Sequence, residues 1–551
     1  MSMEYEGLQG FMGLSSGSKV FRPGQGEATE AIIRHLEYGN EIVVELSAPT
    51  GAGKTLILGT VGNYQAFKGR RVTYCTPQAT EVDQVTSLIL DSYGESLPGI
   101  VGRSHYKCAL VPEVKCDECP FPKTPQICPA IKQCTYQMAK NAFMHSNFGV
   151  TTLDYALLNS QVRRTRKILF VDEASRLEGS LLKFMKMMVP EYILTDKRVN
   201  LPSLKNWIGS LTREKAPLDS QLKAIGDVLI NCRFDEETRK RTVYALKDIT
   251  GRITKLERRI RSANLMADYI EEQEPYIIDK DGYFQPLFGR RYFTRLCKGM
   301  KIVLASATPT TDMICDRFVK VEMSHPIPVS QRRVIYLPVS AMGRSGKTPD
   351  GLREMAFMIL ALHEREASGR HTLVHCHSLA LAKELYAIIG SDSRVILQQP
   401  GKNRKESLDL WGNTPEAIFL SFSYEYSLNL KGPGFPLNII AKVPFPDLGN
   451  EVERARRELP GGQRRYDLET AMTVMQASGR TTRDITDFSK TYILDRNFGS
   501  FFLNNQDLFS QWFKEALGRE DGKSIIPPKP RWLIDATTPI VNNREQSKGL
   551  A

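Results

Sequence analysis

A glycine-rich loop between a strand and a helix constrains the fold of this chain more than any other feature. The loop reads Ala48-Pro49-Thr50-Gly51-Ala52-Gly53-Lys54-Thr55; it follows the apolar run Ile42 to Leu46 and precedes Leu56-Ile57-Leu58. This order predicts a phosphate-binding loop, because glycines allow the tight turn that points backbone N–H groups at phosphate oxygens. An ordinary Gly-rich turn before a helix is the alternative. The residues expected to bind ATP here are Thr50, Gly51, Ala52, Gly53, Lys54 and Thr55, with Lys54 on the β- and γ-phosphates and Thr55 on Mg²⁺.

A second expected ATP contact lies upstream of the loop, in Phe21-Arg22-Pro23-Gly24-Gln25, just before an expected helix from Ala28 to Tyr38. An aromatic ring can stack on a nucleobase, and the amide of Gln25 offers both a donor and an acceptor to an adenine edge. We therefore expect Phe21, Arg22 and Gln25 to bind the adenine. A plain Arg-Pro-Gly turn is the alternative.

Two neighbouring acids follow the apolar strand Lys167 to Val171, in the run Asp172-Glu173-Ala174-Ser175. Adjacent carboxylates at the tip of an apolar strand are costly unless a cation or catalysis requires them. We expect Asp172 to hold Mg²⁺ through water and Glu173 to orient and deprotonate the attacking water. A solvated strand end is the alternative.

Five of the ten cysteines lie within one short, proline-rich insert: Cys108, Cys116, Cys119, Cys128 and Cys134. So many prolines and so few periodic apolar positions do not predict a packed core, so a metal centre is expected to hold the segment together. Four thiolates suit either tetrahedral zinc or a cubane iron–sulfur cluster, and spacing alone does not separate them. One cysteine is then spare, and Cys116 and Cys119 compete most directly. Unligated structural cysteines are the alternative.

The region from about Leu177 to Leu296 is expected to be helical and rich in Lys and Arg, with helices at Glu237–Asp248 and Arg252–Met266. Such charge runs usually form the solvent-exposed face of a helix. The more specific alternative is that they line a nucleic-acid channel. Further on, strands alternate with helices, which predicts a second parallel sheet. Its expected strands are His371–Cys376, Arg394–Leu397, Ala417–Ser421, Asn438–Val443 and Thr491–Asp495.

The run Gln476-Ala477-Ser478-Gly479-Arg480-Thr481-Thr482-Arg483 follows an expected helix, Leu468 to Met475. Arg480 and Arg483 are three residues apart, so a helix would point both the same way. Guanidinium groups delivered across a cleft can neutralise the charge on a transferred γ-phosphate. The expected catalytic residues are therefore Lys54, Asp172, Glu173, Gln476, Arg480 and Arg483, with a surface basic pair as the alternative for the two arginines.

The net charge of +12 favours a polyanionic partner such as nucleic acid. No apolar run is long enough to span a bilayer, and the first residues lack the layout of a signal peptide. A cytoplasmic location without membrane contact is therefore expected.

Together these motifs resemble the iron–sulfur superfamily 2 DNA helicases of the XPD and DinG type. The ordered set is F-R-P-G-Q, A-P-T-G-A-G-K-T, the cysteine insert, V-D-E-A-S, S-A-T-P and Q-A-S-G-R-T-T-R, from about Phe21 to Arg496. The resemblance implies an α/β fold with two RecA-like motor domains, an inserted 4Fe-4S domain and an inserted helical arch. It also implies ATP-driven 5′ to 3′ translocation on single-stranded DNA, with forked DNA as the substrate of a monomer.

The resemblance also sets domain boundaries. Motor domain 1 is expected at 1–100, 146–195 and 297–330, the cluster domain at 101–145, the arch at 196–296, motor domain 2 at 331–536 and a flexible tail at 537–551. The short arch suggests a compact bacterial, archaeal or phage version. Ser175 and Asn429 depart from the family pattern, which has histidine and an acid there. Two other functions stay open: an ATP-driven translocase that does not unwind duplex, and a redox-responsive nucleic-acid-binding protein with a decayed motor.

Overall fold

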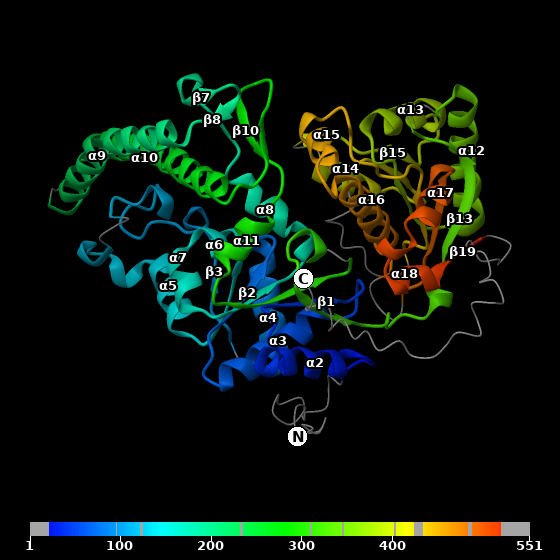
Figure 1. The fold of residues 1–551 in the computed structure, drawn as a ribbon, viewed down its shortest axis with the longest axis horizontal. Coiled ribbons are helices and arrows are strands. Elements are labelled where there is room, and N and C mark those ends of the chain that lie inside the picture. The colour runs from blue at the N-terminus through cyan, green and yellow to red at the C-terminus, as the bar shows by residue number, and fades with distance from the viewer. Residues whose placement is uncertain are drawn as a thin grey trace, which may run out of the picture.

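Two seven-stranded parallel sheets organise the chain into two lobes (Figure 1). The computed structural model describes residues 21–94, 96–121, 125–231, 235–308, 311–343, 346–401, 404–423, 434–482 and 487–519. Asn429, Arg483 and the expected tail therefore lie outside the described residues. Among the described helices, none is long and apolar enough to cross a membrane.

The first sheet has the strand order β12-β1-β11-β5-β2-β4-β3. Its strands are β1 Val43–Ser47, β2 Val72–Thr76, β3 Gly99–Ile100, β4 Phe148–Thr152, β5 Ile168–Val171, β11 Lys301–Ser306 and β12 Phe318–Glu322. The helices of this lobe are α2 Gln25–Tyr38, α3 Lys54–Phe67, α4 Ala79–Tyr93, α5 Thr135–His145, α6 Leu153–Leu158, α7 Ser160–Thr165, α8 Leu177–Lys183 and α11 Arg290–Leu296. Strands β1, β2 and β5 are buried throughout, as expected for parallel strands covered on both faces.

The second sheet has the order β15-β16-β14-β17-β18-β13-β19. Its strands are β13 Val334–Ser340, β14 Thr372–His375, β15 Val395–Leu397, β16 Ile418–Ser421, β17 Leu437–Ile440, β18 Lys490–Asp495 and β19 Leu517–Arg519. Its helices are α12 Pro349–Glu366, α13 Leu379–Ile389, α14 Arg404–Asn413, α15 Glu451–Glu458, α16 Gly462–Ser478, α17 Asn497–Asn504 and α18 Gln511–Ala516. The expected α/β fold with two RecA-like parallel-sheet domains is thus confirmed.

A long helical hairpin projects from the first lobe, at the left of Figure 1, and consists of α9 Leu201–Asn231 and α10 Glu236–Glu271. The expectation of two separate helices within α10 is wrong. Gly251 does not break the helix, because the packing of α10 against α9 outweighs the low helix propensity of a single glycine. Leu246, Thr250 and Ile253 are buried at helical spacing and face the partner helix.

The region between Leu177 and Leu296 is also less helical than expected. It contains a three-stranded antiparallel sheet of β6 Met187–Met188, β9 Tyr276–Ile278 and β10 Tyr283–Pro286, and a small pair, β7 Leu194–Thr195 and β8 Arg198–Val199. These strands are two to four residues long, which is too short for an alternating pattern to stand out in the sequence.

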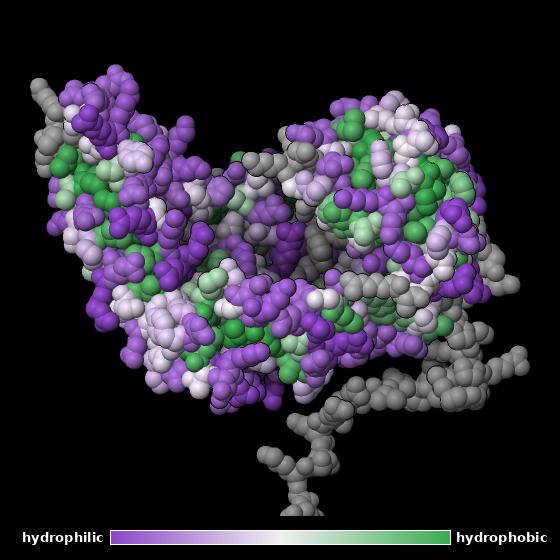
Figure 2. Space-filling view, turned by 90° about the horizontal axis from the view of Figure 1, so that it is seen from above, coloured by the Kyte–Doolittle hydropathy of each residue, from purple (hydrophilic) through white to green (hydrophobic). Residues whose placement is uncertain are grey.

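A hollow separates the helical hairpin from the second lobe. Figure 2 shows it from above, and its visible walls carry many hydrophilic residues. The cysteine-rich segment lies beside the hairpin, since Arg239 of α10 pairs with Glu113 at 3.1 Å. The hollow is therefore flanked by elements from both lobes and from the inserted hairpin.

Candidate functional site

The glycine-rich loop joins β1 to α3 at the carboxyl edge of the first sheet. Gly51 and Gly53 adopt left-handed backbone conformations, with φ of 78° and 80°, which side chains disfavour. A Cβ on Gly53 would also lie 2.3 Å from Nε2 of Gln25. Lys54 begins α3, and its ammonium donates to the carbonyl oxygens of Ala48 at 3.3 Å and Pro49 at 3.5 Å. The loop therefore presents a helix N-terminus and an ammonium group together, which suits an anionic ligand.

Gln25 and Arg22 brace this loop. The Gln25 amide donates to the Ala52 carbonyl oxygen at 2.7 Å and accepts from the Arg22 backbone N–H at 2.8 Å. The Arg22 guanidinium donates to the Gly51 carbonyl oxygen at 3.1 Å. Helix α2 begins at Gln25 rather than at Ala28, because Gly24 turns the chain with φ of 84°. These residues thus hold the shape of the loop, while their contact with adenine, like that of the half-buried Phe21, stays a prediction.

Asp172 directly follows β5 and faces the loop. Its carboxylate accepts from the Tyr74 hydroxyl at 2.7 Å and from the Glu173 backbone N–H at 2.9 Å. Burial raises the pKa of Asp172, and the positive charge of Lys54 and the Tyr74 hydrogen bond oppose that rise. Thr55 also hydrogen-bonds Tyr74. The expected magnesium residues Thr55 and Asp172 therefore meet around one tyrosine.

Sequence reasoning missed Tyr74, which lies on β2 opposite Phe170 of β5. Burial, with the nearby Asp172 charge, raises the pKa of Tyr74 well above its usual range, so the hydroxyl keeps its proton and acts as a donor. The sequence does place a tyrosine within the apolar strand at 72–76. A buried tyrosine hydroxyl needs a hydrogen-bond partner, and this requirement could have indicated Asp172.

The backbone of Glu173 is in the left-handed conformation, with φ of 51°, which residues other than glycine rarely adopt. The Ser175 hydroxyl donates to the Glu173 carboxylate at 3.1 Å. The Ser175 side chain is thus hydrogen-bonded within its own acidic loop.

The second lobe meets the loop at the end of α16. A Cβ on Gly479 would lie 3.1 Å from the Thr50 hydroxyl. The Gln476 amide donates to the Thr308 hydroxyl at 3.3 Å, and the Trp512 indole donates to the Ala307 carbonyl oxygen at 3.2 Å. The expected run from Gln476 therefore lies across from both the phosphate loop and the Ser306-Ala307-Thr308 segment.

The expected geometry of the two arginines needs correction. Helix α16 ends at Ser478, so Arg480 follows the helix instead of continuing it, and no shared helical face orients it. Arg480 is buried, with 8% of its surface exposed. Arg483 lies outside the described residues.

Four of the five cysteines contact one another in pairs, although within the described ranges no group of three or more His, Cys, Asp or Glu side chains is arranged to hold a metal ion. Cys108 hydrogen-bonds Cys119, and Cys116 hydrogen-bonds Cys134. The Cys119 sulfur accepts from the Phe121 N–H at 3.3 Å, and backbone N–H groups also reach the sulfurs of Cys108 and Cys128. The net effect differs between the thiols: the hydrogen bond from Cys119 lowers the pKa of Cys108 to about 6, whereas that bond raises the pKa of Cys119 and burial raises the pKa of Cys116 and of Cys128. Metal binding by these cysteines therefore stays a prediction.

The helicase C-terminal domain family matches residues 362–516. No curated protein matches the chain in sequence. Among solved structures, an XPD helicase superposes with a TM-score of 0.58 at 14% identity, covering 91% of this chain and 98% of that chain. The chain has the fold of the XPD helicases.

Two further XPD structures support this conclusion. An apo XPD superposes with a TM-score of 0.54, covering 90% of this chain and 99% of that one, and S. tokodaii Xpd4 with a TM-score of 0.53, covering 90% and 100%. Both are 14% identical to this chain. The fold that the motifs led us to expect is therefore confirmed, and it extends over both lobes.

Proposed function

We propose that this protein is an ATP-dependent DNA helicase that moves 5′ to 3′ along single-stranded DNA and unwinds forked duplexes. The observation that carries the proposal is the approach of Gly479 to Thr50. It brings the end of α16 in the second lobe against the phosphate loop of the first, within an XPD-type fold. A triphosphate bound there would contact both lobes, so its hydrolysis would change how the lobes fit together.

Each predicted residue has a role in this proposal. Lys54 binds the β- and γ-phosphates, and Glu173 orients and deprotonates the attacking water. Mg²⁺, held by Thr55 and Asp172, would neutralise phosphate charge. Gln476 and Arg480 approach from the second lobe, with Arg483 as the further expected arginine, and Phe21, Arg22 and Gln25 lie on the adenine side.

The hollow beside the two lobes is the proposed path of the strand. The net charge of +12 favours a polyanion, and the walls visible in Figure 2 carry many hydrophilic residues. Alternate closing and opening of the lobes would grip and release the strand.

The cysteine-rich segment is proposed to hold a 4Fe-4S cluster, which would cross-link a segment whose Val111 and Val114 are buried in the core shared with the helical hairpin. Four of Cys108, Cys116, Cys119, Cys128 and Cys134 would be the ligands, and Cys116 and Cys119 compete most directly for one place. Iron and sulfide analysis of the purified protein tests this, together with single serine replacements of Cys116 and Cys119. Stoichiometric zinc without sulfide would overturn the cluster assignment.

The central experiment compares Lys54→Ala with Lys68→Ala, a control at the exposed end of the same helix. We expect Lys54→Ala to lose about 100-fold or more of its ATPase and all unwinding, while single-stranded DNA still binds. Forked DNA with a single 5′ or 3′ tail tests direction, and unwinding confined to the 5′-tailed fork is expected. ATP turnover unchanged in Lys54→Ala would refute the proposal, and DNA-stimulated turnover without unwinding would favour a translocase.

A further inference from the structure

A buried ion pair joins the two lobes close to the acidic loop. Glu178 lies in the first turn of α8, five residues after Glu173, and Arg465 lies in the first turn of α16. Arg465 Nη1 donates to Glu178 Oε1 at 2.9 Å, and its Nη2 donates to Oε2, so the contact is bidentate. A bidentate guanidinium–carboxylate contact fixes orientation as well as distance.

The pair is largely removed from solvent. The side chains of Glu178 and Arg465 are 7% and 11% exposed. Burial lowers the pKa of Arg465, but Glu178 and Glu469 outweigh it and raise the pKa overall. Apolar residues can often replace a buried ion pair without loss of stability, so a role in geometry explains this pair better than a role in stability.

The same carboxylate also contacts the end of the inserted hairpin region. The Gly289 backbone N–H donates to Glu178 Oε1 at 3.0 Å, and the Arg465 guanidinium lies 5.0 Å from the ring centre of Phe288. Gly289 directly precedes α11 and follows β10. Glu178 therefore joins the first lobe, the second lobe and the returning chain from the hairpin at one point.

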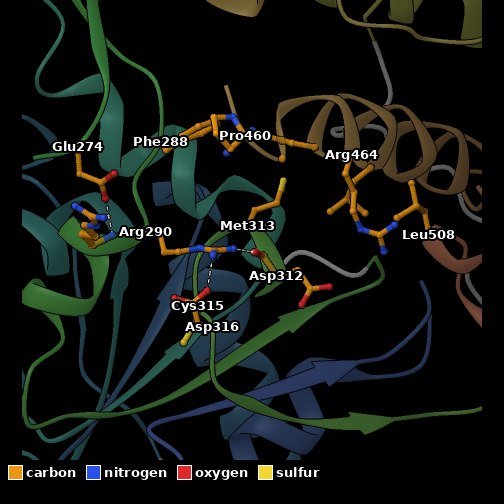
Figure 3. A pocket seen from close by; sticks show the side chains of 14 residues that line it. Glu274, Phe288, Arg290, Asp312, Met313, Cys315, Asp316, Pro460, Arg464 and Leu508 are labelled. Carbon is orange, nitrogen blue, oxygen red and sulfur yellow. Dashed lines mark hydrogen bonds and ion pairs between the residues drawn. The ribbon is translucent and has the colours of Figure 1, made fainter. Parts of the chain in front are cut away.

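Two cavities flank Arg465, and both are lined by it. The first, of about 580 Å³, has Phe288 and Arg290 on one side and Pro460 and Arg464 on the other (Figure 3). The second, of about 370 Å³, reaches from Ser175 to the second lobe. The side chains around Arg465 are therefore not close-packed, and the bidentate ion pair is a close contact between the lobes at this point.

Two short segments of regular structure connect this pair to the proposed ATP site, one in each lobe. In the first lobe, α8 and the turn before it connect Glu178 to Glu173. In the second, α16 runs from Arg465 to Gln476, a distance of about 16 Å at 1.5 Å per residue, and Gln476 contacts Thr308. A change in the angle of α16 about Arg465 would therefore move Gln476 and the following Arg480.

We propose that Glu178 and Arg465 form a positioning pair that sets the angle of α16 and so couples strand binding in the hollow to ATP hydrolysis. This rests on the proposed helicase function. Ser175 turns toward Glu173, and Glu178, one turn further along, makes the connection to the second lobe instead. When the pair is intact, closure aligns Gln476 and Arg480 with the triphosphate; when it is lost, the lobes close without that alignment.

The test compares Glu178→Gln with Arg464→Gln. Arg464 is the matched control, because it neighbours Arg465 but pairs with Asp507 of its own lobe at 2.7 Å and is 62% exposed. The kcat and KM for ATP are measured with and without a single-stranded oligonucleotide. We expect Glu178→Gln to lower the DNA-stimulated kcat about tenfold or more, with KM for ATP changed less than about threefold because Lys54 and its loop are untouched. Arg464→Gln is expected to behave like the wild type.

Arg465→Lys is a second variant in case Glu178→Gln does not fold. It keeps the positive charge at this position but cannot make the bidentate contact with Glu178. An intermediate kcat with unchanged KM is expected, with a melting temperature near that of the wild type. If DNA stimulated the ATPase of Glu178→Gln or Arg465→Lys as strongly as that of the wild type, the inference would be wrong but the proposed helicase function would stand. A wild-type protein whose ATPase does not respond to DNA would instead overturn the proposed function.

Discussion

Removal of the Tyr74 hydroxyl gives a sharp test of how the first lobe prepares its acidic residue. Asp172 is half-buried and accepts two hydrogen bonds, one of them from Tyr74 at 2.7 Å. Because that bond lowers the pKa of Asp172, Tyr74→Phe raises this pKa further. The carboxyl group then keeps its proton up to a higher pH, and the acid limb of the ATPase profile moves upward.

The size of the effect follows from the bond that is lost. A hydrogen bond to a charged group contributes about 1.5–3 kcal/mol, and about 1.4 kcal/mol corresponds to a tenfold change. We therefore expect the ATPase rate of Tyr74→Phe relative to the wild type to fall as the pH is lowered, toward a limit of about tenfold where Asp172 is protonated in both proteins. The rate at pH 8 and saturating Mg²⁺ should change much less.

The assay is steady-state ATP hydrolysis from pH 5.5 to 9 at several Mg²⁺ concentrations. Tyr93→Phe is the matched control, since it removes another buried hydroxyl of the same lobe, one that contacts Thr60 at 2.8 Å. An acid limb in Tyr74→Phe that coincides with those of the wild type and Tyr93→Phe would refute the reasoning.

Two further predictions concern stability. Gly62→Ala should lower the free energy of unfolding by about 1–3 kcal/mol, because a Cβ at this position would lie 2.3 Å from the Phe148 ring. Gly251→Ala should raise the free energy of unfolding by about 1 kcal/mol, because nothing lies within 4 Å of a Cβ there and alanine has the higher helix propensity. Urea unfolding of both variants checks these opposite signs. Burial and the charge of Arg332 lower the pKa of His325 to about 3, so its stabilising contribution is present above pH 6.5 and is lost as the pH falls from 6.5 toward 3, by about 2 kcal/mol at pH 5. Unfolding of the wild type and His325→Gln at pH 7 and pH 5 measures this loss, and equal acid sensitivity of the two would contradict it.

The sequence predicted most of the buried strands because parallel strands covered on both faces leave unbroken apolar runs. The expected strand His371–Cys376, for example, contains β14 Thr372–His375. Helix ends were less predictable: α16 extends from Gly462 to Ser478, beyond the expected Leu468 and Met475. A glycine and polar residues begin this helix, where the surrounding lobe and not the helix propensity decides the boundary.

The candidate site was predictable as a set of motifs and not as a set of contacts. The loop at Lys54 and the acids at Asp172 each carry a local pattern. Tyr74 and the Glu178–Arg465 pair carry none, because each acts through a partner far away in the chain, 98 and 287 residues respectively. Such pairs become visible only when the sheet order and the meeting of the lobes are known.

The position of β1 has a consequence for how the protein is made. This strand, which carries the phosphate loop, lies between β11 and β12, and both follow it by more than 250 residues. During synthesis β1 thus has no lateral neighbour until the whole hairpin insertion has left the ribosome. Contacts of such long range slow folding, and nascent chains halted before Lys301 would lack both strands that support the loop.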